Sequence, residues 1–144
     1  MSDEPYGRGT APSLLICDDN EGIRALLAEI VGRSLGIQVV GECADGNEVV
    51  LMAEQLQPDV ILLDLAMPGA DGFEALPKLQ QVAPDARIIV FSGFAGPAVA
   101  ERLLALGATS CLQKGAPADT IMATIYEALS MPWVAEPDHA HKMS

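Results

Sequence analysis

The chain has 144 residues, with 8 Lys or Arg against 20 Asp or Glu, so its formal net charge is −12. This length fits one domain, and an apolar share of 50% is enough to bury a core, which excludes disorder over most of the chain. An acidic chain repels phosphate backbones, so we expect no direct nucleic-acid binding. The sequence contains no apolar run near the roughly 18 residues of a membrane span, so we expect no membrane insertion.

The cysteines and the N-terminal residues point to the cytoplasm. Cys17, Cys43 and Cys111 are an odd number, lie far apart, and each sits in an apolar segment. They are therefore predicted to be buried thiols of a reducing compartment. The polar start lacks the basic and apolar regions of a secretory signal.

Short apolar runs alternate with amphipathic stretches along the chain. In chain order, the predicted elements are strand 13–17, helix 22–35, strand 37–43, helix 47–56, strand 60–64, helix 72–82, strand 87–92, helix 97–106, strand 110–113 and helix 118–129. Pro77 is placed in the first turns of its helix, and the polar segments 1–12 and 132–144 are predicted to be a flexible arm and tail. This alternation predicts an α/β fold, a doubly wound parallel sheet with helices on both faces.

Ligands of such a fold bind at the carboxyl ends of the strands, and polar residues follow four of them. They are Asp18 and Asp19 after the first strand, Asp64 at the end of the third, Ser92 at the end of the fourth and Lys114 after the fifth. The segment 18–20 could equally cap the following helix, because Asp and Asn favour that position. Together, however, the five residues predict three carboxylates, one hydroxyl and one ammonium at one edge of the sheet.

Three clustered carboxylates need more positive charge than one lysine supplies. Two carboxylates about 4 Å apart repel by ~4 kcal/mol at an effective dielectric of 20. A divalent cation relieves this repulsion, and carboxylate oxygens with open positions suit Mg²⁺. Asp64 at the strand end could act as a nucleophile toward a phosphoryl group, with Lys114 and Ser92 binding the phosphoryl oxygens. The sequence contains no P-loop motif, and its two histidines, His139 and His141, lie in the tail.

These residues resemble the response-regulator receiver domain of two-component signalling. The resemblance runs from about residue 13 to 129, within a predicted receiver domain of residues 13–131, and is most specific in the segment DLAMPGADGFE (64–74). It implies the flavodoxin-like (βα)5 fold of CheY, with strand order 2-1-3-4-5. The segments 36–50 and 97–117 are most similar to receivers that precede helix-turn-helix output domains.

The resemblance implies a role for each site residue. Asp64 would be the phosphoacceptor, and Asp19, Asp64 and the backbone carbonyl of Ala66 would bind Mg²⁺ directly, with Asp18 binding through water. Ser92 would take the family's hydroxyl role and Lys114 its lysine role. The family's usual aromatic switch residue is replaced by Cys111, which we interpret as a small core residue rather than a redox sensor. Phe94 could shield the acyl phosphate, contact a partner or pack on the following helix.

The leading hypothesis is a phosphorylation-dependent signalling module rather than an enzyme with an external substrate. A sensor histidine kinase or phosphotransfer protein would donate the phosphoryl group. The face formed by 97–106, 110–113 and 118–129 would then bind a downstream effector, and it permits a homodimer. The chain could stand alone or could be the receiver of a longer regulator with an output domain.

Two alternatives stay open. A degenerate receiver would act as a phosphorylation-independent binding module, as the missing aromatic suggests. An aspartyl-nucleophile phosphatase would need a second acid two residues after Asp64, where this chain has Ala66.

Overall fold

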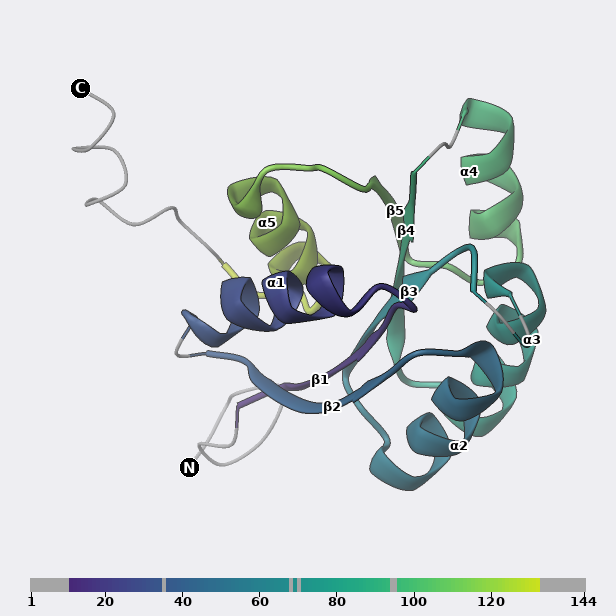
Figure 1. Cartoon of the computed structure of the whole chain (residues 1–144), viewed down its shortest axis with the longest axis horizontal. Helices are drawn as coiled ribbons and strands as arrows, with labels where there is room; N and C mark the ends of the chain where they lie inside the picture. The colour runs from purple at the N-terminus through teal and green to yellow at the C-terminus, as the bar shows by residue number, and fades with distance from the viewer. Residues whose placement is uncertain (1–10, 35, 68, 70, 94–95, 133–144) are drawn as a thin grey trace.

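The computed structural model describes residues 11–34, 36–67, 69, 71–93 and 96–132, and within them five strands alternate with five helices (Figure 1). The strands are β1 (Ser13–Cys17), β2 (Gln38–Cys43), β3 (Val60–Asp64), β4 (Arg87–Ser92) and β5 (Ser110–Gln113). The helices are α1 (Glu21–Gly32), α2 (Gly46–Leu56), α3 (Gly72–Val82), α4 (Pro97–Ala105) and α5 (Ala118–Ala128). The strands form one parallel sheet in the order β2-β1-β3-β4-β5, which confirms the predicted fold class and strand order.

The two faces of the sheet are covered by different helices. Alternate residues of β1, β3 and β4 point to opposite faces. One set, including Leu15, Ile61 and Val90, packs under α2, α3 and α4. The other set, including Ile16 and Leu62, packs under α1 and α5. The view in Figure 1 shows these two helical layers on either side of the sheet.

Burial on both faces explains the sequence of the central strand. All five residues of β3 are buried, and four of them are aliphatic. The fifth is Asp64, 2% exposed at the carboxyl end. The strand pairs with β1 on one side and β4 on the other, so its end lies between those of its two neighbours.

Helix capping accounts for the two differences between predicted and observed helix starts. Helix α1 begins at Glu21 because Asn20 caps it, and α2 begins at Gly46 because the Asp45 carboxylate accepts from two amides of its first turn. Helices α4 and α5 end one residue earlier than predicted, at Ala105 and Ala128, and α1 ends at Gly32. Strand β2 begins at residue 38, one residue later than predicted.

Pro77 and the terminal segments complete the comparison with the predicted organisation. Pro77 is the sixth residue of α3 and lies in its second turn, in agreement with its predicted place in the first turns. The predicted arm (1–12) and tail (132–144) fall almost entirely outside the described residues, and Phe94 does so too. The flexibility of these two segments and the role of Phe94 remain predictions.

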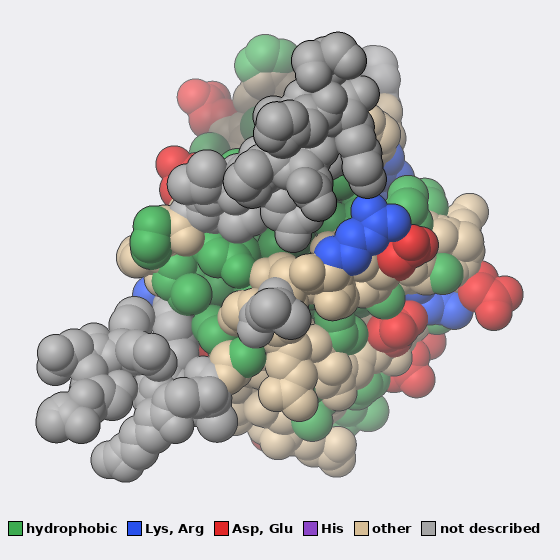
Figure 2. All heavy atoms as spheres, turned by 90° about the vertical axis from the view of Figure 1, so that its left-hand side faces the viewer, with side chains coloured by type: hydrophobic (Ala, Val, Ile, Leu, Met, Phe, Trp, Pro, Cys, Tyr) green, Lys and Arg blue, Asp and Glu red, His purple; other side chains and the backbone are tan. Residues whose placement is uncertain are grey.

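Figure 2 shows the side of the molecule that carries α1 and α5. Hydrophobic and uncharged atoms occupy the middle of this face, and acidic and basic side chains lie toward its edges. One of the exposed hydrophobic residues is Leu26 of α1, whose exposed fraction is 54%. Among the residues that the structure describes, no helix combines the length and the apolar character needed to traverse a bilayer.

Candidate functional site

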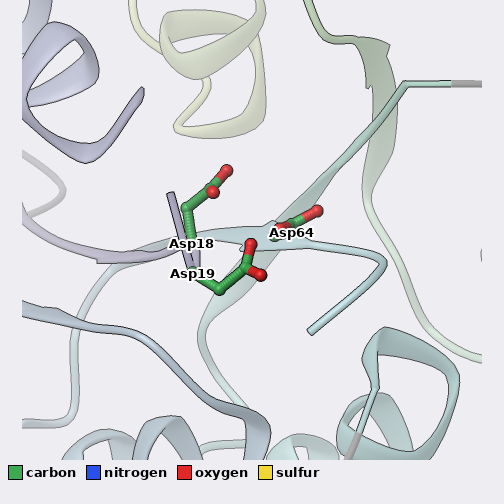
Figure 3. Close-up of side chains that lie close together, drawn as sticks. All are labelled: Asp18, Asp19 and Asp64. Carbon is green, nitrogen blue, oxygen red and sulfur yellow. The ribbon is translucent and has the colours of Figure 1, made fainter. Parts of the chain in front are cut away.

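Three carboxylates meet at the carboxyl edge of the sheet. Oxygen atoms of Asp18, Asp19 and Asp64 all lie within 4.8 Å of one another (Figure 3). Asp18 and Asp64 are buried, with exposed fractions of 1% and 2%, whereas Asp19 is exposed. The predicted cluster therefore exists, and it combines two buried acids with one that faces solvent.

In the turn after β1, Asn20 caps α1, whereas Asp18 and Asp19 belong to the acid cluster. Asn20 caps α1, because its side-chain oxygen accepts from the amide of Ile23 at 3.0 Å. The Asp18 carboxylate accepts instead from the amide of Asn20 at 2.9 Å, which fixes the turn. Capping therefore falls to Asn20 alone, and the two aspartates remain at the site.

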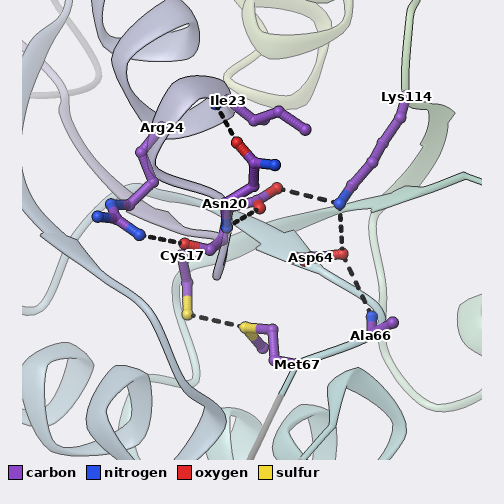
Figure 4. A network of polar contacts seen from close by, with 9 residues as sticks. Cys17, Asn20, Ile23, Arg24, Asp64, Ala66, Met67 and Lys114 are labelled. Carbon is purple, nitrogen blue, oxygen red and sulfur yellow. Dashed lines mark hydrogen bonds and ion pairs between the residues drawn. The ribbon is translucent and has the colours of Figure 1, made fainter.

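Lys114 is the cation in contact with the two buried acids. Its Nζ lies 3.0 Å from Asp64 Oδ1 and 3.3 Å from Asp18 Oδ2 (Figure 4). Lys114 follows β5, and Asp64 ends β3, so the side chain must extend past β4 to reach the acids. Strands lie about 4.8 Å apart, and a long side chain is therefore needed at this position.

Ser92 and Ala66 lie beside this ion-pair network. Ser92, 5% exposed, ends β4 one residue beyond Phe91, the register partner of Asp64. The Ser92 carbonyl accepts from the backbone amide of Lys114 at 2.9 Å, which joins the two backbones at the site. The amide of Ala66 donates to Asp64 Oδ1 at 3.2 Å. Both predicted residues are thus placed at the edge, with Ala66 in hydrogen-bond contact with Asp64.

The pKa values of Asp64 and Lys114 are both raised, which favours the neutral form of the carboxyl and the charged form of the amine. Burial raises the pKa of Asp64 to about 6, and the charge of Asp18 adds to this increase, while Lys114 and the Ala66 amide oppose it. Burial also lowers the pKa of Lys114, but its hydrogen bond and ion pair with Asp64, and the charge of Asp18, outweigh this and raise it overall. Lys114 therefore stays protonated at neutral pH, whereas Asp64 loses its proton only as the pH rises through about 6.

The arrangement fits a divalent cation. Two buried oxygens, Asp18 Oδ2 and Asp64 Oδ2, accept no hydrogen bond from the described residues, although the first lies within ion-pair distance of Lys114. Buried carboxylate oxygens without donors are costly to keep. A hard cation that prefers oxygen ligands and retains waters, as Mg²⁺ does, would satisfy both atoms, with Asp19 at the solvent side.

The cysteines were predicted to be three buried thiols, which is correct for two of them. Cys17 and Cys43 are buried, and Cys111 is half-buried because β5 is an edge strand. Cys111 pairs in register with Val90, and its Sγ lies 4.0 Å from the carbonyl of Ala100 in α4. Burial raises the pKa of its thiol. These contacts favour its interpretation as a packing residue.

Arg24 was not predicted to take part in the site. It belongs to the first turns of α1, and its guanidinium donates to the backbone carbonyl of Asp18 at 2.7 Å (Figure 4). A signal for it exists in the sequence. A cation near a helix N-terminus opposes the helix dipole, so an arginine four residues after the N-cap requires a compensating contact.

Comparison with known proteins gives one consistent family. The model of the response regulator receiver domain matches residues 14–126. The transcriptional regulatory protein LiaR of Bacillus subtilis is 38% identical over 115 residues, which cover 80% of this chain and 54% of LiaR. The response regulator GacA of Pseudomonas aeruginosa is 29% identical over 131 residues, which cover 91% of this chain and 61% of GacA.

Solved structures agree with the sequence relatives. A LuxR-family two-component response regulator from Aurantimonas sp. SI85-9A1 has a TM-score of 0.80 and 27% identity, covering 92% of this chain and 94% of that one. The response regulator domain of Thermotoga maritima CheB has a TM-score of 0.78 and 29% identity, covering 86% and 100%. The chain spans little more than half the length of LiaR and GacA, and the relatives include a transcriptional regulator, as the resemblance predicted. On its fold, its acidic site and these matches, the chain belongs to the response regulator receiver domain family.

Proposed function

We propose that this domain accepts a phosphoryl group on Asp64 from a sensor histidine kinase or phosphotransfer protein, in the cytoplasm. The observation that carries the proposal is the pair of buried carboxylates, Asp18 and Asp64, which share one lysine and each keep one oxygen that accepts no hydrogen bond from the described part of the chain. Such a site holds unfavourable negative charge that a divalent cation relieves, and the bound cation together with Lys114 can then neutralise an incoming phosphoryl group.

The transfer needs a nucleophilic oxygen and groups that neutralise the phosphoryl charge. An Asp64 carboxylate oxygen attacks phosphorus, the bond between phosphorus and the donor imidazole nitrogen breaks, and the imidazole leaves and takes up a proton. Lys114 would pair with one phosphoryl oxygen and the Ser92 hydroxyl would donate to another. The site's raised Lys114 pKa supports the first of these roles, because that ammonium remains charged.

The magnesium ion would be held by Asp19, Asp64 and the Ala66 carbonyl, with Asp18 binding through water. When bound, Mg²⁺ supplies positive charge that neutralises the phosphoryl oxygens and the acid cluster. The separation of the acids within 4.8 Å supports this ligand set.

Phosphorylation would switch a protein-binding surface. It adds about 1.5 to 2 negative charges and three acceptor oxygens, which Ser92 and Lys114 would follow. Because Lys114 lies directly after β5, its movement would reach the face formed by α4, β5 and α5. That face would bind an effector, an output domain or a second copy of the chain, and Cys111 would leave room there where an aromatic switch is usual. Transcriptional regulators among the relatives support an output domain as one partner.

The test is to incubate the protein with acetyl phosphate and Mg²⁺ and to measure its mass by intact-protein mass spectrometry. We expect the mass of one phosphoryl group on the wild-type protein and on Asp85→Asn, which removes an exposed carboxyl outside the site. The adduct should be absent from Asp64→Asn and from wild type treated with a chelator. An undiminished adduct on Asp64→Asn would refute the assignment. Beryllofluoride with Mg²⁺ should also raise the melting temperature, whereas a degenerate, phosphorylation-independent receiver would not respond.

A further inference from the structure

A second cation, Arg24, contacts the backbone of the acid cluster rather than its carboxylates. Its guanidinium Nη1 donates to the backbone carbonyl of Asp18 at 2.7 Å, and its Nε lies 3.8 Å from a carboxylate oxygen of Glu42 on β2. The arginine side chain is 20% exposed. Figure 4 shows it reaching from α1 to the end of β1. It therefore joins α1, β1 and β2 where the two adjacent aspartates emerge.

The peptide that Arg24 holds links Asp18 to Asp19. The other contacts of the turn fix its beginning and its end: the Asp18 amide donates to the Cys43 carbonyl at 3.0 Å, and the Asn20 amide donates to the Asp18 carboxylate at 2.9 Å. The carbonyl between the two aspartates is bonded to Arg24. Rotation of that peptide would move both carboxylates with respect to Asp64.

We infer that Arg24 is a positioning residue that holds the Asp18–Asp19 peptide in the orientation required for Mg²⁺ binding. This inference rests on the proposed metal site. The charge of Arg24 cannot be what favours the ion, because a nearby cation repels Mg²⁺ and also opposes the α1 dipole. If Arg24 acts by positioning the peptide, neutralising its side chain should weaken Mg²⁺ binding. If it acted only through its charge, neutralising it should strengthen Mg²⁺ binding.

The test measures Mg²⁺ affinity by isothermal titration calorimetry on the whole chain. We expect Arg24→Gln to weaken binding about ten-fold, the lower end of the range for loss of a group that orients a metal ligand. Arg24→Lys should also weaken binding, because an ammonium does not reproduce the planar guanidinium contact. The matched control is Arg33→Gln, which removes the same charge from an exposed position just after α1 and should leave the affinity within about two-fold.

A measurement on the metal-free protein separates positioning from general loss of structure. Hydrogen exchange at the Asn20 amide should accelerate in Arg24→Gln, while amides in the middle of β3 and β4 keep their protection. Unchanged exchange at Asn20, or Mg²⁺ affinity in Arg24→Gln equal to or higher than in wild type, would overturn the inference. If wild type itself does not bind Mg²⁺, the proposed metal site fails, and the exchange measurement still decides whether Arg24 holds the turn.

Discussion

Replacing Asp64 with Asn should stabilise the metal-free protein, although it removes an ion-pair partner of Lys114. Burial and Asp18 raise the pKa of Asp64 from 3.8 to about 6. At 1.36 kcal/mol per pH unit, this increase in pKa means that ionised Asp64 costs the folded state on the order of 3 kcal/mol relative to its neutral form. Asn is close to that neutral form in shape, and Lys114 keeps its contact with Asp18 in the variant.

The sign of the effect depends on pH. The folded state holds the Asp64 proton more tightly than the unfolded chain does, so stability from the neutral form is complete below pH 3.8. It is lost as pH rises through 6, and the full cost is present at pH 7.5. Urea unfolding in the presence of a chelator should therefore show Asp64→Asn to be more stable than wild type at pH 7.5, by up to about 3 kcal/mol, with the advantage shrinking toward pH 4.

The control separates local repulsion from the net charge of the chain. Glu54→Gln also removes one negative charge, but from an exposed position on α2, and should change stability by less than about 0.5 kcal/mol. Mg²⁺ should stabilise wild type and largely cancel the advantage of Asp64→Asn. The reasoning fails if Asp64→Asn is no more stable than wild type at pH 7.5, or if Glu54→Gln gains as much.

Three further predictions concern the side chains of Lys114 and Cys111 and the backbone at Gly72. Lys114→Met should raise the Asp64 pKa above about 6 in metal-free protein, because Lys114 lowers it; the carboxyl ¹³C shift measures this, and an unchanged midpoint would contradict the ion pair. Gly72→Ala should cost about 1–3 kcal/mol in urea unfolding, since an added Cβ would lie 2.8 Å from the backbone after β3, whereas Gly32→Ala, with open space, should be neutral or slightly stabilising. A maleimide should label half-buried Cys111 before the two buried thiols, and Cys111→Ala should abolish that first phase.

The fold could be predicted because the chain repeats one simple pattern. Runs such as 60–64 are apolar without alternation, as a strand buried on both faces must be, and stretches between them have helical spacing. Parallel pairing then brings the carboxyl ends of the strands together. Asp18, Asp64 and Lys114 are far apart in sequence, yet their meeting follows from this topology alone.

The features that could not be predicted depend on side-chain reach rather than on pattern. Arg24 bonds a backbone carbonyl, and sequence spacing alone does not specify the partner of a long side chain. Asp45 caps α2 from a loop where other polar residues compete for the same position. Cys111 is only half-buried because β5 lies at the sheet edge, a position that strand order sets and local composition does not.

The site is therefore an unfavourable charge arrangement that the rest of the fold maintains. Asp64 lies at the end of a strand whose other residues are aliphatic and buried, so it cannot move into solvent without disrupting the core. Asp18 is held by an amide on one side and an arginine-bound carbonyl on the other. Because the scaffold prevents the acids from separating, their repulsion is relieved by what binds between them. A domain built this way converts the binding of a cation or a phosphoryl group into a change of stability at one edge of the sheet, next to the elements that present its partner surface.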